Sequence, residues 1–152
     1  MSNRVYGELG VPLVIHGGGP TTNYGGSLMR LETMEAMADA GRSFVSIETL
    51  NRRIGAYIAQ VTGAEAGMVV AGAAAGMVVS LASCMTGTDV AAVRRLPDTR
   101  GLRDEMVIQK AHRGPYSHMY GFTGARIVEV GDVVNCIPDE LDSALSDDTA
   151  AV

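Results

Sequence analysis

A run of small residues, Val69–Gly76, is the strongest candidate for a binding site in this sequence. It consists of Val-Val-Ala-Gly-Ala-Ala-Ala-Gly, in which an apolar stretch passes through Gly72 into alanines. The pattern predicts a strand that turns into a helix, and the free N–H groups and positive dipole at a helix start attract phosphate. Glycine and alanine also leave an anion room to approach. Tight packing of a helix against a sheet favours small residues as well, so this alternative stays open.

A second candidate follows an apolar run that ends at Lys110. This run is expected to be a strand, and it leads into His112 and Arg113. Residues directly after parallel strands line the crevices in which α/β proteins bind ligands. The imidazole of His112 can stack on a planar ring, and the guanidinium of Arg113 can hold a carboxylate or a phosphate. An ordinary exposed His–Arg pair is the competing interpretation, because both residue types are common on surfaces.

Other catalytic patterns are missing from the sequence. The three histidines form no triad and no zinc-ligand spacing. The two cysteines, Cys84 and Cys136, lie far apart without a CxxC motif, so we expect two buried thiols and a reducing cytoplasm. Asp98, Asp104 and Glu105 stand among turn formers, which indicates a solvated loop rather than metal binding. The sequence therefore predicts no metal site.

Lysine occurs once in the sequence, as Lys110. A Schiff base formed within these residues would have to use this amine. Nothing in its sequence neighbourhood predicts the desolvation that lowers the pKa of a lysine. We therefore expect no nucleophilic role for Lys110, and we assign no catalytic residue.

The composition suits a packed protein without an electrostatic surface for nucleic acid. The 152 residues are 47% hydrophobic and 19% charged, and the formal net charge is −5, so a nucleic-acid partner is not expected. Residues 66–86 carry no charge and include a GxxxG spacing, Gly72 to Gly76, which makes a membrane helix an alternative. The segment is rich in alanine, glycine and serine, and its glycines fall where a strand is expected to turn into a helix. We therefore predict no membrane span.

Apolar periodicity predicts alternating helices and strands, as in an α/β protein whose mainly parallel sheet has flanking helices. The expected helices are 28–41, 47–61, 73–86, 117–124 and 138–145. The expected strands are 67–71, 106–110, 126–130 and 149–152. Glycine, proline and polar residues make 6–23 and 89–103 irregular. We predict two parts, an N-terminal arm with the first helix at 1–45 and an incomplete large domain at 46–152.

Motifs along nearly the whole chain resemble one family of enzymes. They are Val14-Ile15, Tyr24–Met29, Glu35–Met37, Val61–Ala66, Gly72–Ala75, Leu96–Thr99, Val107–Lys110 with His112-Arg113, Tyr116 with His118, and Gly124-Ala125 with Val128–Gly131. Together they resemble pyridoxal 5'-phosphate (PLP) enzymes related to bacterial selenocysteine synthase (L-seryl-tRNA selenium transferase). More narrowly, they are similar to the branch that includes D-glucosaminate-6-phosphate ammonia-lyase. Their order and spacing make the combination specific, although no single motif is.

The resemblance implies the fold-type-I PLP architecture. That architecture has a large domain built on a mainly parallel sheet, a smaller C-terminal domain, and a dimer with active sites at its interface. Carried over, the turn of Gly72, Ala73 and Ala74 would bind the PLP phosphate through backbone N–H groups, and His112 would stack on the pyridine ring. The Schiff-base lysine and the aspartate that pairs with the pyridine nitrogen would follow Val152. We therefore expect the 152 residues of this sequence to be an N-terminal part of the enzyme.

The resemblance also implies substrate-binding residues. Gly26 and Ser27 would lie near a substrate, including that of a partner subunit, and Arg113 would hold one of its acidic groups. His16-Gly17 stands where relatives usually have Asn-Ala, and Gly114-Pro115 replaces a more usual polar pair. These departures lie near the expected site, so they leave the identity of the substrate open.

The function implied is a PLP-dependent lyase of the cytoplasm, acting as a homo-oligomer. Its small-molecule substrate would be an amino acid or amino sugar acid, converted into a 2-oxo acid with release of ammonia. Seryl-tRNA selenium transfer is one alternative, and the sequence pI near 5.1 disfavours it because binding tRNA requires a basic surface. A non-catalytic remnant or interaction protein that pairs through an exposed strand at 149–152 is another.

Overall fold

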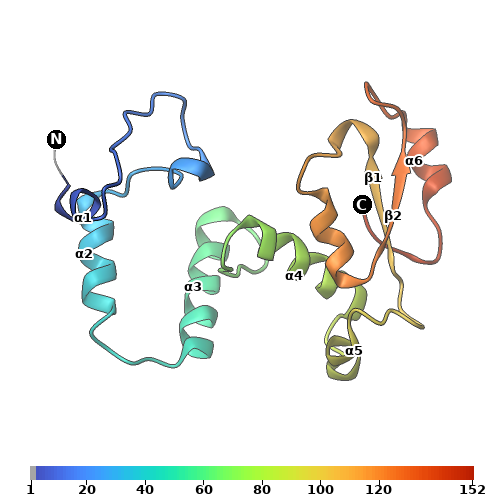
Figure 1. Cartoon of the computed structure of the whole chain (residues 1–152). Helices are drawn as coiled ribbons and strands as arrows, with labels where there is room; N and C mark the ends of the chain where they lie inside the picture. Colours follow the sequence, from blue (N-terminus) through green and yellow to red (C-terminus); the bar gives the residue numbers. More distant parts are fainter. Residues whose placement is uncertain (1–2) are drawn as a thin grey trace. The chain divides into compact units, whose positions relative to one another are not determined.

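The structure is a computed structural model that describes residues 3–152. The chain divides into two compact units, Met1–Leu50 and Asn51–Val152 (Figure 1). The division into domains at 1–45 and 46–152 stays a prediction.

The described residues of the first unit form short helices and a glycine-rich loop. Its elements are α1 (Arg4–Glu8), the 3-10 helix η1 (Thr22–Tyr24) and α2 (Leu31–Ala40). The segment expected to be irregular, 6–23, is so over most of its length, but the expectation is wrong at 6–8, which belong to α1, and at 22–23, which belong to η1. The side-chain oxygen of Asn3 accepts hydrogen bonds from the N–H groups of Val5 and Tyr6 at 3.1 and 3.3 Å. This cap starts a helix that apolar periodicity alone does not predict.

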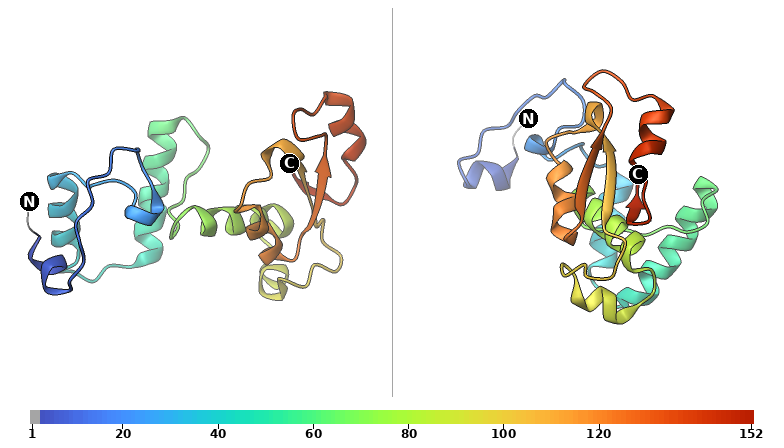
Figure 2. Two further views of the ribbon diagram at one scale, coloured as in Figure 1. Left: turned by 45° about the horizontal axis from the view of Figure 1, so that its top comes forward. Right: turned by 90° about the vertical axis from the view of Figure 1, so that its right-hand side faces the viewer.

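The second unit is built on three parallel strands, which lie side by side in Figure 2. The strands are β1 (Glu105–Gln109), β2 (Arg126–Val130) and β3 (Thr149–Ala151), in the spatial order β2-β1-β3. In the register, Val107 lies opposite Val128. Three of the predicted strands are thus confirmed to within a residue or two, and so is the α/β class with a parallel sheet.

Three helices precede β1 in the second unit without a strand between them, and the predicted alternation of helices and strands holds from β1 onward. The helices are α3 (Ile47–Thr62), α4 (Ala73–Thr86), α5 (Val90–Arg95), η2 (Lys110–His112), η3 (Ser117–Thr123) and α6 (Pro138–Ala144). At the start of α6 the Glu140 carboxylate accepts a hydrogen bond from the N–H of Ile137 at 3.0 Å, and Pro138 occupies the first helical position. Both features are typical of a helix N-terminus. Helix η3 is a 3-10 helix rather than an α-helix.

The predicted strand at 67–71 is wrong. Residues 67–70 have no regular secondary structure, and Met68 and Val69 are exposed. A strand requires a hydrogen-bonded neighbour, and no described strand pairs with this segment. The segment instead approaches α3 through two glycines: a Cβ added to Gly55 would lie 2.2 Å from the carbonyl oxygen of Gly67.

The loop predicted at 89–103 contains a helix, α5. The Asp89 carboxylate accepts hydrogen bonds from the N–H groups of Ala91 and Ala92 at 2.8 and 3.2 Å, and Arg94 and Arg95 occupy its last turn. Both features stabilise a helix through its exposed ends and its dipole. The helix was not predicted because the abundant polar residues of this segment indicated a loop.

The core of the second unit lies between α4 and the sheet. Leu81, Met85 and Met106 are buried together there. Although α4 is apolar on nearly every side, only Leu81, Met85 and Thr86 of its residues are buried. The expectation of two buried thiols is wrong, because Cys84 in α4 is exposed and Cys136 is half-buried. Among the described elements, α4 contacts η3, β3 and α5, and side chains such as Val79 stay exposed. No helix within residues 3–152 combines the length and apolar character that crossing a membrane requires.

Candidate functional site

The first candidate site is the N-terminal end of α4. Gly72 is the N-cap, with φ of +91°, a conformation that favours glycine. Its own N–H donates to the carbonyl of Val70 at 2.9 Å. Within residues 3–152 no acceptor is found for the N–H groups of Ala73, Ala74 and Ala75. These three donors sit at the positive end of the helix dipole, which is a suitable place for an anion.

Space at this helix start is also suitable for an anion. A Cβ added to Gly72 would meet nothing within 4 Å, and Ala73 is exposed while Ala74 is half-buried. The first turn contains no acidic side chain. Neither bulk nor negative charge from these residues obstructs a phosphate group, so the residues present fit the phosphate of PLP.

His112 and Arg113 lie directly after β1, as predicted. His112 ends η2 and is exposed. Arg113 is tied to β2 by an ion pair, in which its Nε lies 3.2 Å from Oε1 of Glu129. The carboxylate partially neutralises the guanidinium, so Arg113 is less available to an acidic ligand than the sequence suggests. Within the described residues, no hydrogen bond or ion pair joins His112 or Arg113 to the start of α4.

A turn after β2 adds a residue that the sequence analysis did not single out. The Asp132 carboxylate accepts hydrogen bonds from the N–H groups of Val134 and Asn135 at 2.7 and 2.9 Å. These bonds, with a smaller contribution from the positive charge of Lys110, lower the pKa of Asp132. The Asp-Val-Val-Asn segment after an expected strand is the local signal for this turn. It places a fixed negative charge at the carboxyl edge of the sheet, near Lys110.

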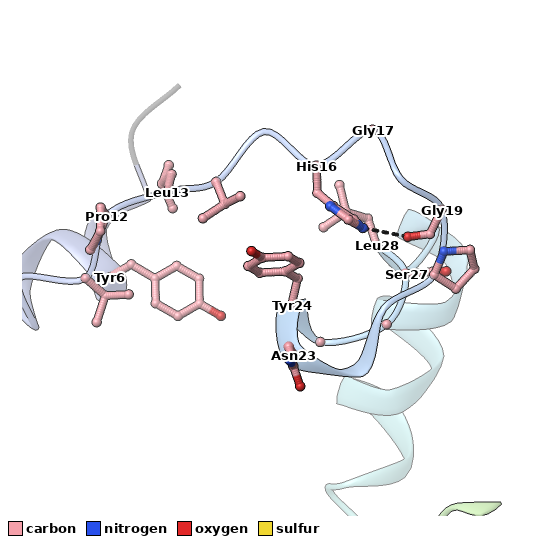
Figure 3. A pocket seen from close by; sticks show the side chains of 15 residues that line it. Tyr6, Pro12, Leu13, His16, Gly17, Gly19, Asn23, Tyr24, Ser27 and Leu28 are labelled. Carbon is pink, nitrogen blue, oxygen red and sulfur yellow. Dashed lines mark hydrogen bonds between the residues drawn. The ribbon is translucent and has the colours of Figure 1, made fainter. Parts of the chain in front are cut away.

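The predicted substrate residues Gly26 and Ser27 lie in the first unit, where they line an open hollow of about 840 Å³ (Figure 3). Its wall is formed by aromatic, aliphatic, polar and small residues between positions 6 and 28. They include Tyr6, His16, Asn23, Tyr24 and Leu28. In the sequence, His16 stands out only as a departure from the family pattern. Nothing in the spacing of these residues predicts that His16 and the tyrosines share one hollow with Gly26 and Ser27.

His16 is held firmly in that hollow. Its Nε2 lies 2.7 Å from the carbonyl oxygen of Gly19 and 3.0 Å from Oγ1 of Thr21. A carbonyl oxygen only accepts, so Nε2 carries the proton, and Nδ1 of the neutral ring is left as an acceptor. The imidazole also packs against Tyr24, with ring centroids 4.8 Å apart and planes tilted by 46°.

The acidic residues near the start of the sheet have structural partners. Asp98 pairs with Arg100 at 2.5 Å, and Asp104 pairs with Arg126 at 3.0 Å. A hydrogen bond from Thr99 and the charge of Arg126 lower the pKa of Asp104. Across residues 3–152, no group of three or more His, Cys, Asp or Glu side chains is arranged to hold a metal ion.

Two enzymes are similar in sequence to nearly the whole chain. D-glucosaminate-6-phosphate ammonia lyase of Salmonella typhimurium (strain 14028s / SGSC 2262) is 33% identical over 156 residues, which cover 100% of this chain and 42% of the relative. The 5'-C-glycyluridine monooxygenase-decarboxylase of Streptomyces sp is 38% identical over 152 residues, which cover 97% of this chain and 38% of the relative. The chain thus spans about two-fifths of the length of these relatives. No family model matches it.

A solved structure of D-glucosaminate-6-phosphate ammonia-lyase has the same arrangement of helices and strands. The two structures agree with a TM-score of 0.93 at 34% sequence identity, over 99% of this chain and 42% of the solved chain. The likeness confirms the α/β fold and supports the narrower branch of the resemblance.

Proposed function

We propose that this chain is part of a PLP-dependent lyase that converts an amino acid or amino sugar acid into a 2-oxo acid and ammonia. The observation that carries the proposal is the TM-score of 0.93 at 34% identity to D-glucosaminate-6-phosphate ammonia-lyase. Membership of the selenocysteine-synthase-like group and the fold-type-I architecture are parts of the same proposal. In the reaction proposed, a β-hydroxyl leaves as water and a second water releases the nitrogen as ammonia.

The start of α4 supports the proposed cofactor. The N–H groups of Ala73, Ala74 and Ala75 would hold the phosphate of PLP, with Gly72 keeping that approach open. His112 would cover one face of the ring, and Arg113 would meet an acidic group of the substrate if it exchanges Glu129 for the ligand. PLP, when bound, supplies an electron sink for the substrate's Cα. We assign no catalytic step to Lys110, which is exposed.

A homo-oligomer is a further part of the proposal. None of residues 3–50 is buried within the chain, although the segment contains large apolar side chains. Ile15, Leu28 and Phe44 are 103%, 101% and 109% exposed. Apolar surface on this scale marks an interaction site, and a second copy of the chain is the proposed occupant. Light scattering after size exclusion tests it: a mass of 15.9 kDa at micromolar concentration would contradict the oligomer.

Oxidative decarboxylation of a glycyl nucleoside is a second candidate function. The observation that favours it is the 38% identity to 5'-C-glycyluridine monooxygenase-decarboxylase, which exceeds the 33% to the lyase. Both names describe an amino acid attached to a sugar-derived portion. The two candidates therefore differ in the reaction rather than in the general kind of substrate.

The two candidate functions are distinguished by the products that each reaction releases. The protein that carries this segment is incubated with PLP and either D-glucosaminate, its 6-phosphate or 5'-C-glycyluridine. The lyase predicts ammonia and a 2-oxo acid in equal amounts, without consumption of oxygen. Oxygen uptake with release of carbon dioxide from 5'-C-glycyluridine would establish the second candidate instead. Absence of all these products would contradict both.

Cofactor binding by the 152-residue chain is tested separately. PLP is added, the chain is reduced with borohydride, and labelled lysine is identified by mass spectrometry. We expect binding that inorganic phosphate competes away and no stoichiometric label on Lys110. Stoichiometric labelling of Lys110 together with turnover would overturn the assignment of no catalytic role to this residue.

A further inference from the structure

The hollow lined by residues between Tyr6 and Leu28 combines aromatic rings with polar groups but contains no formal charge. Tyr6, His16 and Tyr24 surround the same open space in Figure 3, and Asn23 and Ser27 also line it. No lysine, arginine, aspartate or glutamate is among its lining residues. A volume of about 840 Å³ lies in the range of small-molecule sites, which usually have apolar and aromatic walls with a few polar groups.

We propose that this hollow receives the uncharged sugar portion of the substrate and discriminates against a phosphorylated one. This inference rests on the proposed function, since it names the substrate class of the same enzyme. The substrate would then be an amino acid with an unphosphorylated, hydroxylated sugar or nucleoside tail. His16 and Tyr24 are the residues that determine this specificity.

The polar groups of the hollow suit hydroxyl groups. Because Nε2 of His16 donates to Gly19, its Nδ1 remains an acceptor for a ligand hydroxyl. Tyr24 and Ser27 carry hydroxyls that donate and accept, and Asn23 carries an amide that does both. A sugar presents hydroxyls of the same dual character, so each can find a partner. Ring faces of tyrosine and histidine add contact with a sugar ring or a planar base.

A phosphate is poorly matched to the same groups. Phosphate recognition relies on arginine, lysine or clustered N–H donors, and the lining residues contain neither cation. The glycine-rich loop turns the carbonyl of Gly19, rather than its N–H, toward His16. A carbonyl oxygen and an acceptor nitrogen repel an anion. Arg30, the nearest arginine after the hollow in the sequence, is not among its lining residues.

The hollow is also preorganised. His16 is fixed by two hydrogen bonds and by packing against Tyr24. A Cβ added to Gly18 would lie 3.0 Å from Cε1 of His16, so a larger residue in the loop would displace the imidazole. Groups held in place before binding lose little freedom when a ligand arrives.

Direct binding of unreactive probes tests the inference. Isothermal titration of the full chain uses uridine, D-gluconate and 6-phospho-D-gluconate, all of which lack the amino group. We expect uridine and D-gluconate to bind, and 6-phospho-D-gluconate to bind about tenfold more weakly than D-gluconate. Tighter binding of the phosphorylated acid, or no binding of either unphosphorylated probe, would overturn the inference.

Substitutions locate the binding. His16→Ala and Tyr24→Ala should each weaken uridine binding about tenfold, the effect typical of losing one stacking side chain. Matched controls are His118→Ala and Tyr57→Ala, which remove an exposed histidine and tyrosine outside the hollow and should leave binding unchanged. Equal effects of the two pairs would overturn the inference, since binding would then occur elsewhere.

Failure of this inference differs from failure of the proposed function. Ammonia release from D-glucosaminate 6-phosphate at higher kcat/KM than from D-glucosaminate would keep the lyase and overturn the uncharged subsite. Uridine binding that depends on Tyr24, without turnover of any amino acid, would support the subsite and contradict the lyase.

Discussion

Arg113 Nε lies 3.2 Å from Glu129 Oε1, so the guanidinium that follows β1 is held by a carboxylate of β2. The two side chains are 35% and 41% exposed, so the pair contributes little to stability, at most about 1 kcal/mol. Its more important effect is that Glu129 binds the guanidinium of Arg113, which the sequence predicts to bind an acidic ligand.

Glu129→Gln should therefore release Arg113 and strengthen binding of anions near the carboxyl edge of the sheet. We expect inorganic phosphate to bind about two- to fivefold more tightly, which corresponds to roughly 0.4–1 kcal/mol, measured by titration. Asp39→Asn is the control, since it frees Arg42 from a surface pair in the first unit. Weaker binding after Glu129→Gln would show that Arg113 needs the ion pair to reach the ligand.

Two glycines cap the ends of α4. Substituting each of them distinguishes an effect on anion binding from an effect on stability. Gly72 and Gly87 have φ of +91° and +54°, and an added Cβ would meet nothing within 4 Å at either position. Gly72→Ala and Gly87→Ala should each destabilise the protein by about 1–3 kcal/mol through backbone strain alone. Only Gly72→Ala should also weaken PLP binding, because the strain distorts the N–H groups of the first turn.

The comparison uses urea unfolding for stability and spectroscopic titration for PLP. Equal losses of PLP affinity in both variants would mean that the start of α4 does not hold the phosphate. Full affinity in Gly72→Ala would mean the same.

Gly55 of α3 lies so close to Gly67 that position 55 has no room for a side chain. A Cβ at position 55 would lie 2.2 Å from a backbone oxygen, which no side-chain movement relieves. Gly55→Ala should therefore destabilise the second unit by about 2 kcal/mol or more, despite the higher helix propensity of alanine. Gly121→Ala is the control, because its Cβ would meet open space. Urea unfolding that ranks the two variants equally would contradict the close packing.

Asp98 provides a pH-dependent readout of the loop after α5. A side-chain hydrogen bond from Arg100 and one from its backbone N–H lower the pKa of Asp98 from 3.8 to about 2. Since the pKa is lower in the folded state, the interaction stabilises the fold fully above pH 3.8. That stabilisation is lost as the pH falls through about 2.

Arg100→Ala should raise the pKa of Asp98 part of the way toward 3.8, because the N–H of residue 100 still donates at 3.2 Å. Carboxyl-carbon NMR shifts between pH 1 and 6 measure this. Arg103→Ala is the control, since no ion pair of Arg103 is found within residues 3–152. An unchanged titration in Arg100→Ala would contradict the pairing.

Local signals predicted several parts of this structure correctly. The alternation that predicts β1 and β2 depends on apolar residues close in sequence, and the helical repeat of α3 does too. The turn from Gly72 into α4 was also predicted, because a small-residue run is recognisable without knowing its neighbours. Capping by Asp89 was local as well, but its short polar segment was interpreted as a loop.

The sequence by itself determined the α/β class, the parallel strands and the helix whose first turn is free of bulk and charge, since these depend on residues near one another in the chain. Only the tertiary structure decided that 67–71 is no strand, that Glu129 holds Arg113, and that His16 and Tyr24 share a hollow with Ser27. A strand needs a neighbour, an ion pair needs a second side chain, and a hollow needs several loop positions brought together. Such contacts depend on how the backbone folds in space, which composition and periodicity do not specify.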